Sequence, residues 1–258
     1  MRSLIAAGIL LASGATIAAP TSSLLDEVQQ RGALKVCTTG DYKPYTFLRD
    51  DKQYEGIDIA LTESLAKSLG VEVEWVPTTW KTLMPDFLAR CDMAVGGVSI
   101  SLERQKKAFF SEPIAVDGKI PFVRCDEVEK YQTIEQLNQP SVRLIEPPGG
   151  TNEAFVHREL PKAQLELFDD NTVIFKSVAD NKADVMITDS SEALYQQRNY
   201  PTLCAVNPES PLQYSEKAFL LPRDDMAFKA YVDQWLHLTK ATGEYKRIAD
   251  KWLAKPSQ

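Results

Sequence analysis

The chain has 258 residues, of which 44% are hydrophobic and 25% are charged, a balance typical of globular proteins and not of disordered ones. Its formal net charge is −7 and it has no run of lysine or arginine, so it lacks the basic stripe of a nucleic-acid-binding surface. Four cysteines without a CxxC pair, with only His157 and His237 beside them, argue against a zinc site.

The first residues, MRSLIAAGILLASGATIAAP, have the pattern of a signal peptide. Arg2 gives the positive start, residues 4–11 give an apolar core, and small residues up to Ala19 give a cleavage pattern. An uncleaved anchor is less favoured, because the core is short. No later stretch approaches the roughly 18 apolar residues of a membrane span. We expect residues 1–19 to be removed and the mature chain to be a soluble periplasmic protein without a membrane anchor.

Strands and helices alternate along the next part of the chain. A helix over 24–30 is followed by a short strand, a helix that stops at Gly70, a second strand, another helix, and a third strand. Their sequences are ALKVCT, IDIALTESLAKSLG, VEVEWVP, WKTLMPDFLAR and CDMAVGG. The β-α-β-α-β order predicts a parallel sheet with helices on both faces.

The same alternation restarts later, in VRLIEPPGG, TNEAFVHREL, QLELF, TVIFKSVADN, ADVMITD and SSEALYQQ. EKAFLL is predicted to be a further strand, and helices over 226–241 and 244–254 close the chain. The restart predicts an α/β protein with two lobes. KIPFVRC, at 119–125, is expected to cross into the second lobe, and TLCAVNPESPLQ, at 202–213, to return. We expect lobe 1 to hold 20–121 and 214–258, and lobe 2 to hold 122–213.

The loops that follow the strands carry the candidate binding residues, because ligands of open α/β sheets bind beyond the carboxyl ends of the strands. PPGGTNE sets two glycines before a helix start, so backbone N–H groups, Thr151 and Asn152 could bind an anion. A glycine turn before a helix is also common for folding reasons alone. Arg104 of SISLERQ could clamp a carboxylate with two parallel bonds, or it could belong to a solvated face.

Other candidates also follow strand ends. Trp80 and Tyr45 could form the walls of a pocket or be core residues. Asp41 follows a glycine, where aspartate is a routine turn former. Lys119 lies at the crossing between the lobes and could reach a ligand or be exposed.

Glu192 in TDSSEAL has two interpretations. In the first, Asp189 and Glu192 form a capping box, in which each side chain satisfies a backbone N–H group at the helix start. In the second, Glu192 is a general acid. The helix N-terminus opposes the second interpretation, because it favours the carboxylate form.

The two-lobe plan, the signal peptide, GGVSISLER and PPGGTNE together resemble the type II periplasmic solute-binding proteins of the polar amino-acid family. The resemblance narrows to the cyclohexadienyl dehydratases, secreted enzymes of this fold that act on prephenate and arogenate. It rests on TTGDYKP, VPTTW, SISLERQ, PGGTNE, the TDxxEA of 188–193 and YVDQWLH. The resemblance implies an α/β periplasmic-binding-protein type II fold, with a two-strand hinge and an interlobe cleft.

The resemblance also implies roles for single residues. Glu192 would be the proton donor, and no cofactor or metal would be needed. Cys125 and Cys204 would form a disulfide near the hinge, whereas Cys37 and Cys91 are additional and are left as bonded or as buried thiols. The resemblance gives binding roles to Asp41, Trp80, Arg104, Lys119 and Asn152. The remaining predicted substrate-binding residues, which do not rest on the resemblance, are Tyr45, Ser99, Thr151 and Asp189.

We expect Glu192 to become a competent acid when the lobes close and the carboxylates of the substrate approach, because lost water and nearby like charges both raise a carboxyl pKa. The alternative function is that of an amino-acid or carboxylate receptor of an ABC transporter, in which Asp189 would hold the amino group of the ligand. A ligand-sensing domain is a third interpretation. The oligomeric state, a homo-oligomer included, is left open.

Overall fold

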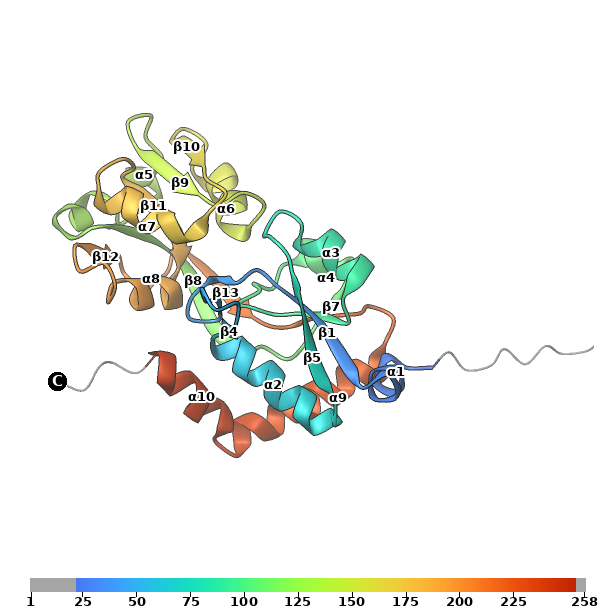
Figure 1. The fold of residues 1–258 in the computed structure, drawn as a ribbon. Helices are drawn as coiled ribbons and strands as arrows, with labels where there is room; N and C mark the ends of the chain where they lie inside the picture. The colour runs from blue at the N-terminus through green and yellow to red at the C-terminus, as the bar shows by residue number, and fades with distance from the viewer. Residues whose placement is uncertain (1–21, 254–258) are drawn as a thin grey trace, which may run out of the picture.

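The structure is a computed structural model that describes residues 22–253 (Figure 1). The predicted signal peptide, residues 1–19, lies outside the described residues. None of the helices within 22–253 is both long enough and apolar enough to pass through a membrane.

The first sheet has five strands in the order β5-β1-β6-β14-β7. The first three strands in this order, β5, β1 and β6, are parallel, as the sequence predicts. β14 runs antiparallel to both of its neighbours, β6 and β7. The bounds of the strands are β1 Ala33–Thr38, β5 Glu72–Pro77, β6 Met93–Ala94, β7 Phe109–Phe110 and β14 Leu220–Leu221.

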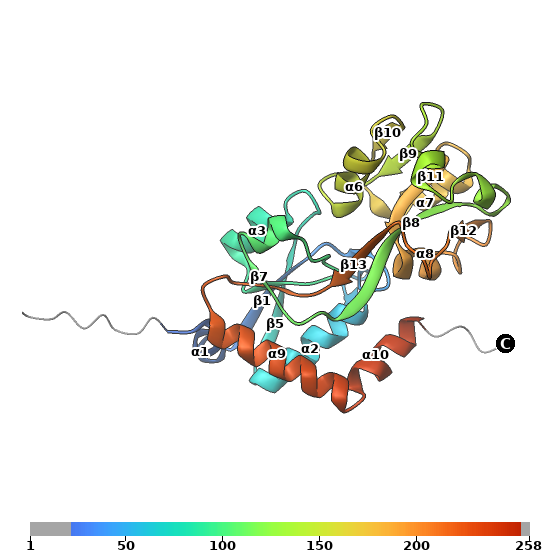
Figure 2. The same ribbon diagram turned by 180° about the vertical axis from the view of Figure 1, so that it is seen from behind.

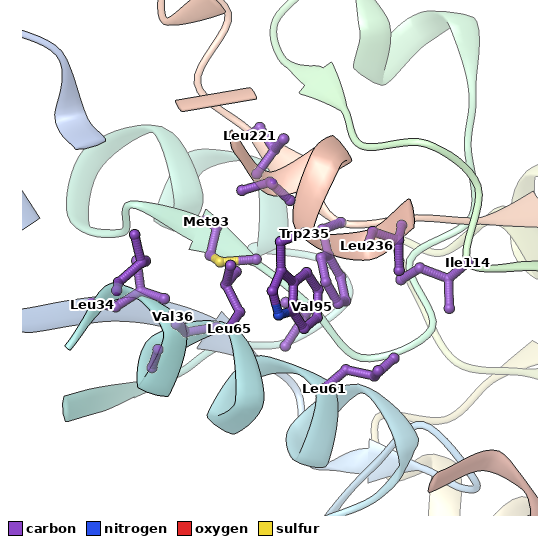
Figure 3. Packing of buried hydrophobic residues seen from close by; sticks show 14 of the residues in the cluster. Leu34, Val36, Leu61, Leu65, Met93, Val95, Ile114, Leu221, Trp235 and Leu236 are labelled. Atoms are coloured by element: carbon purple, nitrogen blue, oxygen red, sulfur yellow. The ribbon is translucent and has the colours of Figure 1, made fainter. Parts of the chain in front are cut away.

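Helices cover both faces of this sheet. On one face Leu61 and Leu65 of α2 and Trp235 of α9 pack against Val36 and Met93 of the strands (Figure 3). On the other face α3 packs through Leu83 and Phe87. The helices of this lobe are α1 Leu24–Arg31, α2 Ile57–Leu69, α3 Leu83–Arg90, α4 Leu102–Gln105, α9 Met226–Ala241 and α10 Glu244–Leu253.

The second sheet has six strands, with β10-β9-β11-β8-β12 in order and β13 paired to β8. The parallel strands β9, β10 and β11 come from the second β-α repeat. Helices α5 and α6 pack on one face and α7 and α8 on the other. The bounds are β8 Ala115–Arg124, β9 Arg143–Glu146, β10 Gln164–Leu167, β11 Val185–Asp189, β12 Leu203–Ala205, β13 Gln213–Lys217, α5 Ile134–Leu137, α6 Thr151–Glu159, α7 Asn171–Ala179 and α8 Ser190–Gln196, with a 3-10 helix at Cys125–Lys130.

Two antiparallel strands, β8 and β13, connect the sheets (Figure 2). The first half of β8 pairs with β13, and its second half pairs with β11 and β12. The α/β class and the two-lobe plan with a two-strand connection are confirmed. The lobe boundaries at 121/122 and 213/214 stay our proposal.

Three details differ from the sequence predictions. EKAFLL is not one strand, because β13 ends at Lys217 in one sheet and β14 begins at Leu220 in the other. Part of the expected return crossing forms β12, a strand of the second sheet, and β13 makes the return. A small sheet of β2 Asp41–Tyr42, β3 Thr46–Leu48 and β4 Tyr54–Glu55 was not predicted.

Two disulfides are present, and each closes within one lobe. Cys37 of β1 is bonded to Cys91, which precedes β6 in the first sheet. Cys125 is bonded to Cys204 of β12 at the end of β8. The bond that the sequence left open is therefore formed.

Candidate active site

A pocket lies between the two sheets. Both lobes contribute to it: loops after β5 and β6 face the start of α6 and the ends of β11 and β13. Its lining consists of Tyr42, Trp80, Gly97, Ser99, Arg104, Pro147, Gly150, Thr151, Asn152, Asn171, Asp189 and Lys217.

Asp189 at the end of β11 is the centre of a buried ion cluster. Its Oδ1 lies 2.9 Å from the Nζ of Lys119, and its Oδ2 accepts hydrogen bonds from Lys217 and from the hydroxyl of Tyr42. Burial alone would raise the pKa of Asp189, but the two ammonium groups outweigh it and hold the pKa well below its ordinary range. Asp189 is therefore a carboxylate at all physiological pH values.

The two lysines extend this cluster into the pocket. Lys217 donates to the hydroxyl of Ser99 at 2.9 Å, and Lys119 donates to the Oδ1 of Asn152. Burial lowers the pKa of Lys119, and the charge of Asp189 opposes that change. Both buried lysines therefore contact the same carboxylate, that of Asp189.

Arg104 adds a further cation to the lining. Its Nη1 donates to the backbone carbonyl of Ser99 at 2.9 Å, and burial lowers its pKa to about 10, so it stays charged at neutral pH. Within residues 22–253 no carboxylate lies within ion-pair distance of Arg104. The solvated-face alternative does not describe this side chain, because Arg104 lines the pocket while Glu103 and Lys106 are exposed.

The start of α6 faces the same space. Gly150 is the N-cap residue and supplies no side-chain cap, so the first N–H groups of the helix are available to a ligand. Thr151 and Asn152 lie in this first turn and line the pocket. A helix N-terminus with such groups is suited to an anion.

Glu192 lies in the first turn of α8 and is fully buried. Its Oε2 accepts from the hydroxyl of Thr188, and its Oε1 accepts from the Nδ2 of Asn171 at 3.2 Å. The carboxyl group therefore lies directly behind Asn171, which lines the pocket. Burial, followed by the charges of Asp189 and Asp41, raises the pKa of Glu192 to about 8, although the bond from Thr188 lowers it.

The capping-box interpretation of Glu192 is wrong, because Asp189 makes no side-chain cap on α8. Asp117 of β8 takes that place: its Oδ1 accepts from the N–H of Ser191 at 3.1 Å and from the hydroxyl of Ser190 at 2.7 Å. This leaves the carboxylate of Asp189 for the lysines and the carboxyl of Glu192 for Thr188 and Asn171.

Of the nine predicted substrate-binding residues, six line the pocket: Trp80, Ser99, Arg104, Thr151, Asn152 and Asp189. Lys119 lies behind them and contacts Asn152 and Asp189. Tyr45 does not line this pocket: it is a buried core residue that stacks on Tyr42 at 5.8 Å between ring centroids. Tyr42, three residues earlier, is the tyrosine of the pocket wall.

Asp41 does not line this pocket either. Asp41 belongs instead to the lining of a separate surface hollow. Burial raises the pKa of Asp41, and the neighbouring groups of Thr39 and Trp80 oppose the rise.

Sequence reasoning missed Lys217, Tyr42 and Asn171. A signal for Lys217 existed: alternation along QYSEK puts Ser215 and Lys217 on the buried face of β13, and a lysine there must have a partner. Asn171 carried no such signal, because asparagine is common at helix starts. No group of three or more histidine, cysteine, aspartate or glutamate side chains suited to a metal ion occurs in the described part of the chain.

Comparison with known proteins gives one family and several relatives. Residues 34–255 match the bacterial extracellular solute-binding proteins, family 3. The chain is 47% identical to the cyclohexadienyl dehydratase of Pseudomonas aeruginosa, over 90% of this chain and 86% of that protein. It is 27% identical to the L-cystine-binding protein of Escherichia coli, over 89% and 86%.

Solved structures give the same result. The ancestral amino acid-binding protein described as a precursor of cyclohexadienyl dehydratase is 36% identical, with a TM-score of 0.83 and coverage of 90% of this chain and 100% of that one. An ancestral cyclohexadienyl dehydratase is 48% identical, with a TM-score of 0.57 and coverage of 91% and 98%. The chain is thus similar both to binding proteins and to enzymes built on one fold.

Proposed function

The chain belongs to the bacterial extracellular solute-binding proteins of family 3. Within this family we propose that it is a cyclohexadienyl dehydratase with Glu192 as its general acid. Its similarity to the Pseudomonas aeruginosa dehydratase supports the activity. The observation that carries the role of Glu192 is its buried carboxyl group, whose pKa of about 8 leaves it protonated at neutral pH.

The reaction needs one proton and a way to hold negative charge. Prephenate carries a ring carboxylate, a ring hydroxyl and a carboxylate on its side chain. The bond to the ring carboxylate breaks and releases carbon dioxide, its electron pair enters the ring, and the hydroxyl leaves as water with the proton of Glu192. The products are phenylpyruvate from prephenate and phenylalanine from arogenate. The aromatic ring that forms supplies the driving force.

The pocket provides the groups that this substrate requires. Arg104 can take one carboxylate with two parallel bonds, and the start of α6 with Thr151 and Asn152 can take an anion. Asp189 is the group suited to the amino group of arogenate. The ring hydroxyl would take its proton at the side of the pocket lined by Asn171, because the carboxyl of Glu192 lies behind Asn171. In a closed site little water competes with the substrate for that proton.

The cellular setting is also part of the proposal. The predicted leader at 1–19 would export the chain to the periplasm, where the two disulfides are compatible with the oxidising conditions. The enzyme would there contribute to the formation of phenylalanine.

The test is a turnover assay with purified mature protein and prephenate at neutral pH, followed by the ultraviolet absorbance of phenylpyruvate. We expect wild type to accelerate the reaction and Glu192→Gln to lower the rate by about 10²–10⁴-fold, the usual contribution of a general acid. Calorimetric binding of phenylpyruvate should be retained in Glu192→Gln, because the amide keeps the shape of the carboxyl.

Glu166→Gln is the matched control, since Glu166 is an exposed glutamate of the same lobe. Full turnover by Glu192→Gln would remove Glu192 from its role. A wild-type protein that binds amino acids without accelerating prephenate loss would instead be a transport receptor.

A further inference from the structure

The carboxyl group of Glu192 is held by two hydrogen bonds that differ in origin. Its Oε2 accepts from the hydroxyl of Thr188, four residues earlier in the chain. Its Oε1 accepts from the Nδ2 of Asn171, the first residue of α7. The first bond stays within one short segment of the second lobe. The second makes the position of the carboxyl depend on the amide of Asn171.

The amide of Asn171 also contacts the first lobe. Its Nδ2 donates to the main-chain oxygen of Asp41, at 3.0 Å, as well as to the Oε1 of Glu192, at 3.2 Å. Asp41 is followed in β2 by Tyr42, which packs in the core of the first lobe. Asn171 begins α7, whose Ile174 packs in the core of the second lobe. One NH2 group therefore joins the first lobe to the proposed acid of the second.

The bond to Asp41 fixes how this amide is turned. A main-chain carbonyl oxygen only accepts hydrogen bonds, so the NH2 end of Asn171 must face it. The NH2 group has two hydrogens, and the second is donated to Glu192. Separation of the lobes would take the Asp41 oxygen away and leave the amide with one acceptor in place of two. The contact with the first lobe thus helps to hold the amide toward the acid.

Local folding does not account for Asn171. The side-chain cap of α7 comes from Asp170, which accepts from the N–H of Thr172. Asn171 is nevertheless only 1% exposed, and its Oδ1 is buried without a hydrogen-bond partner within residues 22–253. Buried amide oxygens normally have a partner. A buried amide that does not cap its helix and leaves its oxygen unpaired is best explained by what its NH2 group holds.

We propose that Asn171 is a positioning residue that sets the carboxyl of Glu192 in its catalytic position when the lobes close. This inference rests on the proposed dehydratase function. In the open protein the amide of Asn171 would be held by Glu192 alone. Closure adds the oxygen of Asp41, which fixes the amide between two acceptors and fixes the carboxyl of Glu192 with it. The acid thus takes its position around a substrate that is already enclosed.

The bridge predicts two losses from one substitution. Asn171→Ala removes both bonds of the amide. Calorimetric binding of phenylpyruvate should weaken by about 2–10-fold, the usual weight of one hydrogen bond, because closure loses the contact with Asp41. Turnover at saturating prephenate should fall by about 10–100-fold, because a small misplacement of a reacting group is costly. Asn171→Asp keeps the volume of the side chain, but its carboxylate cannot donate, so it should show both losses.

A double-mutant cycle tests whether Asn171 acts through Glu192. In the Glu192→Gln background, Asn171→Ala should change turnover by less than about 2-fold, because the acid that it positions is already gone. Asn199→Ala is the matched control: it removes an exposed amide that donates to Gln196 and lies outside the pocket lining. It should leave both binding and turnover unchanged.

Weaker phenylpyruvate binding with unchanged turnover at saturation would overturn the proposal, since Asn171 would then only hold the lobes together. Slower turnover with unchanged binding would also overturn it, since the contact with Asp41 would then not contribute to closure. An equal fall in turnover with and without Glu192 would show that Asn171 does not act through the acid. Wild type that makes no phenylpyruvate from prephenate would instead refute the dehydratase function, and the role of Asn171 with it.

Discussion

Glu192 occupies the first turn of a helix, where the helix dipole favours an ionised carboxylate by about 0.3–1 kcal/mol. Burial acts in the opposite direction and is larger. A pKa of about 8 in place of 4.5 corresponds to several kcal/mol, at about 1.4 kcal/mol for each pKa unit. We expected lobe closure and the charges of the ligand to raise this pKa. In the structure burial is the main cause, and the charges of Asp189 and Asp41 add to it.

The raised pKa of Glu192 makes both stability and turnover depend on pH. Between about 4.5 and about 8 the folded chain holds a proton on Glu192 that the unfolded chain has released, so the free energy of unfolding falls as pH rises through this range. We expect Glu192→Gln to lack this fall, so its stability advantage over wild type should grow from pH 5 to pH 8. The turnover of wild type should decline above about pH 8.

Urea unfolding of both proteins at several pH values measures the stability difference, and kcat against pH measures the second effect. A stability difference that stays constant with pH would show that Glu192 titrates as an ordinary glutamate. That result would contradict a protonated acid at neutral pH.

Several site residues were predictable at the scale of single residues, because they follow strand ends. Trp80, Arg104 and Asn152 belong to this group. The choice between Tyr42 and Tyr45 was not predictable, since both lie in DYKPY and only the packing of β2 decides which ring faces the cleft. Asn171 was missed because its role depends on α7 lying against β2, a contact between distant parts of the chain.

At the scale of elements, α8 depends on a cap from another element. Asp117 of the connecting strand β8 accepts bonds from Ser190 and Ser191 at the start of α8. An acid at the positive end of a helix is also favoured by the dipole. The strand that joins the lobes thus fixes the helix that carries the proposed acid.

Asp117→Ala should lower the free energy of unfolding by about 2 kcal/mol, because it removes a helix cap and leaves partly buried donors without a partner. It should also lower kcat more than it weakens phenylpyruvate binding, because the start of α8 loses its fixed position. Asp117→Asn, which keeps one acceptor oxygen, should lie between Ala and wild type in both measurements.

Asp126→Ala is the comparison for this prediction, since Asp126 is an exposed acid in the 3-10 helix that follows the same strand. Equal losses in Asp117→Ala and Asp126→Ala, measured by urea unfolding and turnover, would show that the cap has no special effect.

The longer elements were predictable because their apolar residues repeat at helix or strand spacing. β1, β5, α2 and α9 are examples, and Gly70 ends α2 as expected. The two-residue strands of the small sheet were not predictable, since they are too short to show a period. The break in EKAFLL arises because Lys217 turns into the ion cluster while Leu220 joins the other sheet.

At the scale of the whole molecule, the lobes touch through backbone as well as side chains. Gly149, in the loop after β9, has a φ of +83°, and a Cβ on it would lie 2.3 Å from the Cα of Lys81 in the first lobe. Arg198, after α8, donates to the carbonyl of Trp252 in α10 at 2.9 Å. The structure therefore represents a closed arrangement.

Gly149→Ala should oppose this closure, because the added methyl group meets backbone that cannot move aside by itself. We expect a cost of about 1–3 kcal/mol for the overlap, which corresponds to roughly 10–100-fold weaker binding of phenylpyruvate. Calorimetry measures the change in Kd.

Gly70→Ala serves as the matched control, because Gly70 has a similar φ of +73° but no atom within 4 Å of the added Cβ. It reproduces the backbone strain without the contact between lobes. Similar Kd values for the two variants would mean that the Gly149 contact does not limit closure.

The two-lobe plan itself followed from the restart of the β-α alternation. The distances across the cleft could not follow from the sequence, because they depend on how far β8 and β13 bend and on which side chains meet. Tyr42 and Asp189, 147 positions apart in the chain, are one such pair.

The placement of the disulfides bears on how the molecule responds to oxidation. Cys37–Cys91 and Cys125–Cys204 each staple one half of the protein, and neither spans the junction. Disulfide formation thus restrains each lobe separately and does not restrict the motion of one lobe relative to the other. A reducing environment would soften each body from within while the bending of the junction stayed the same.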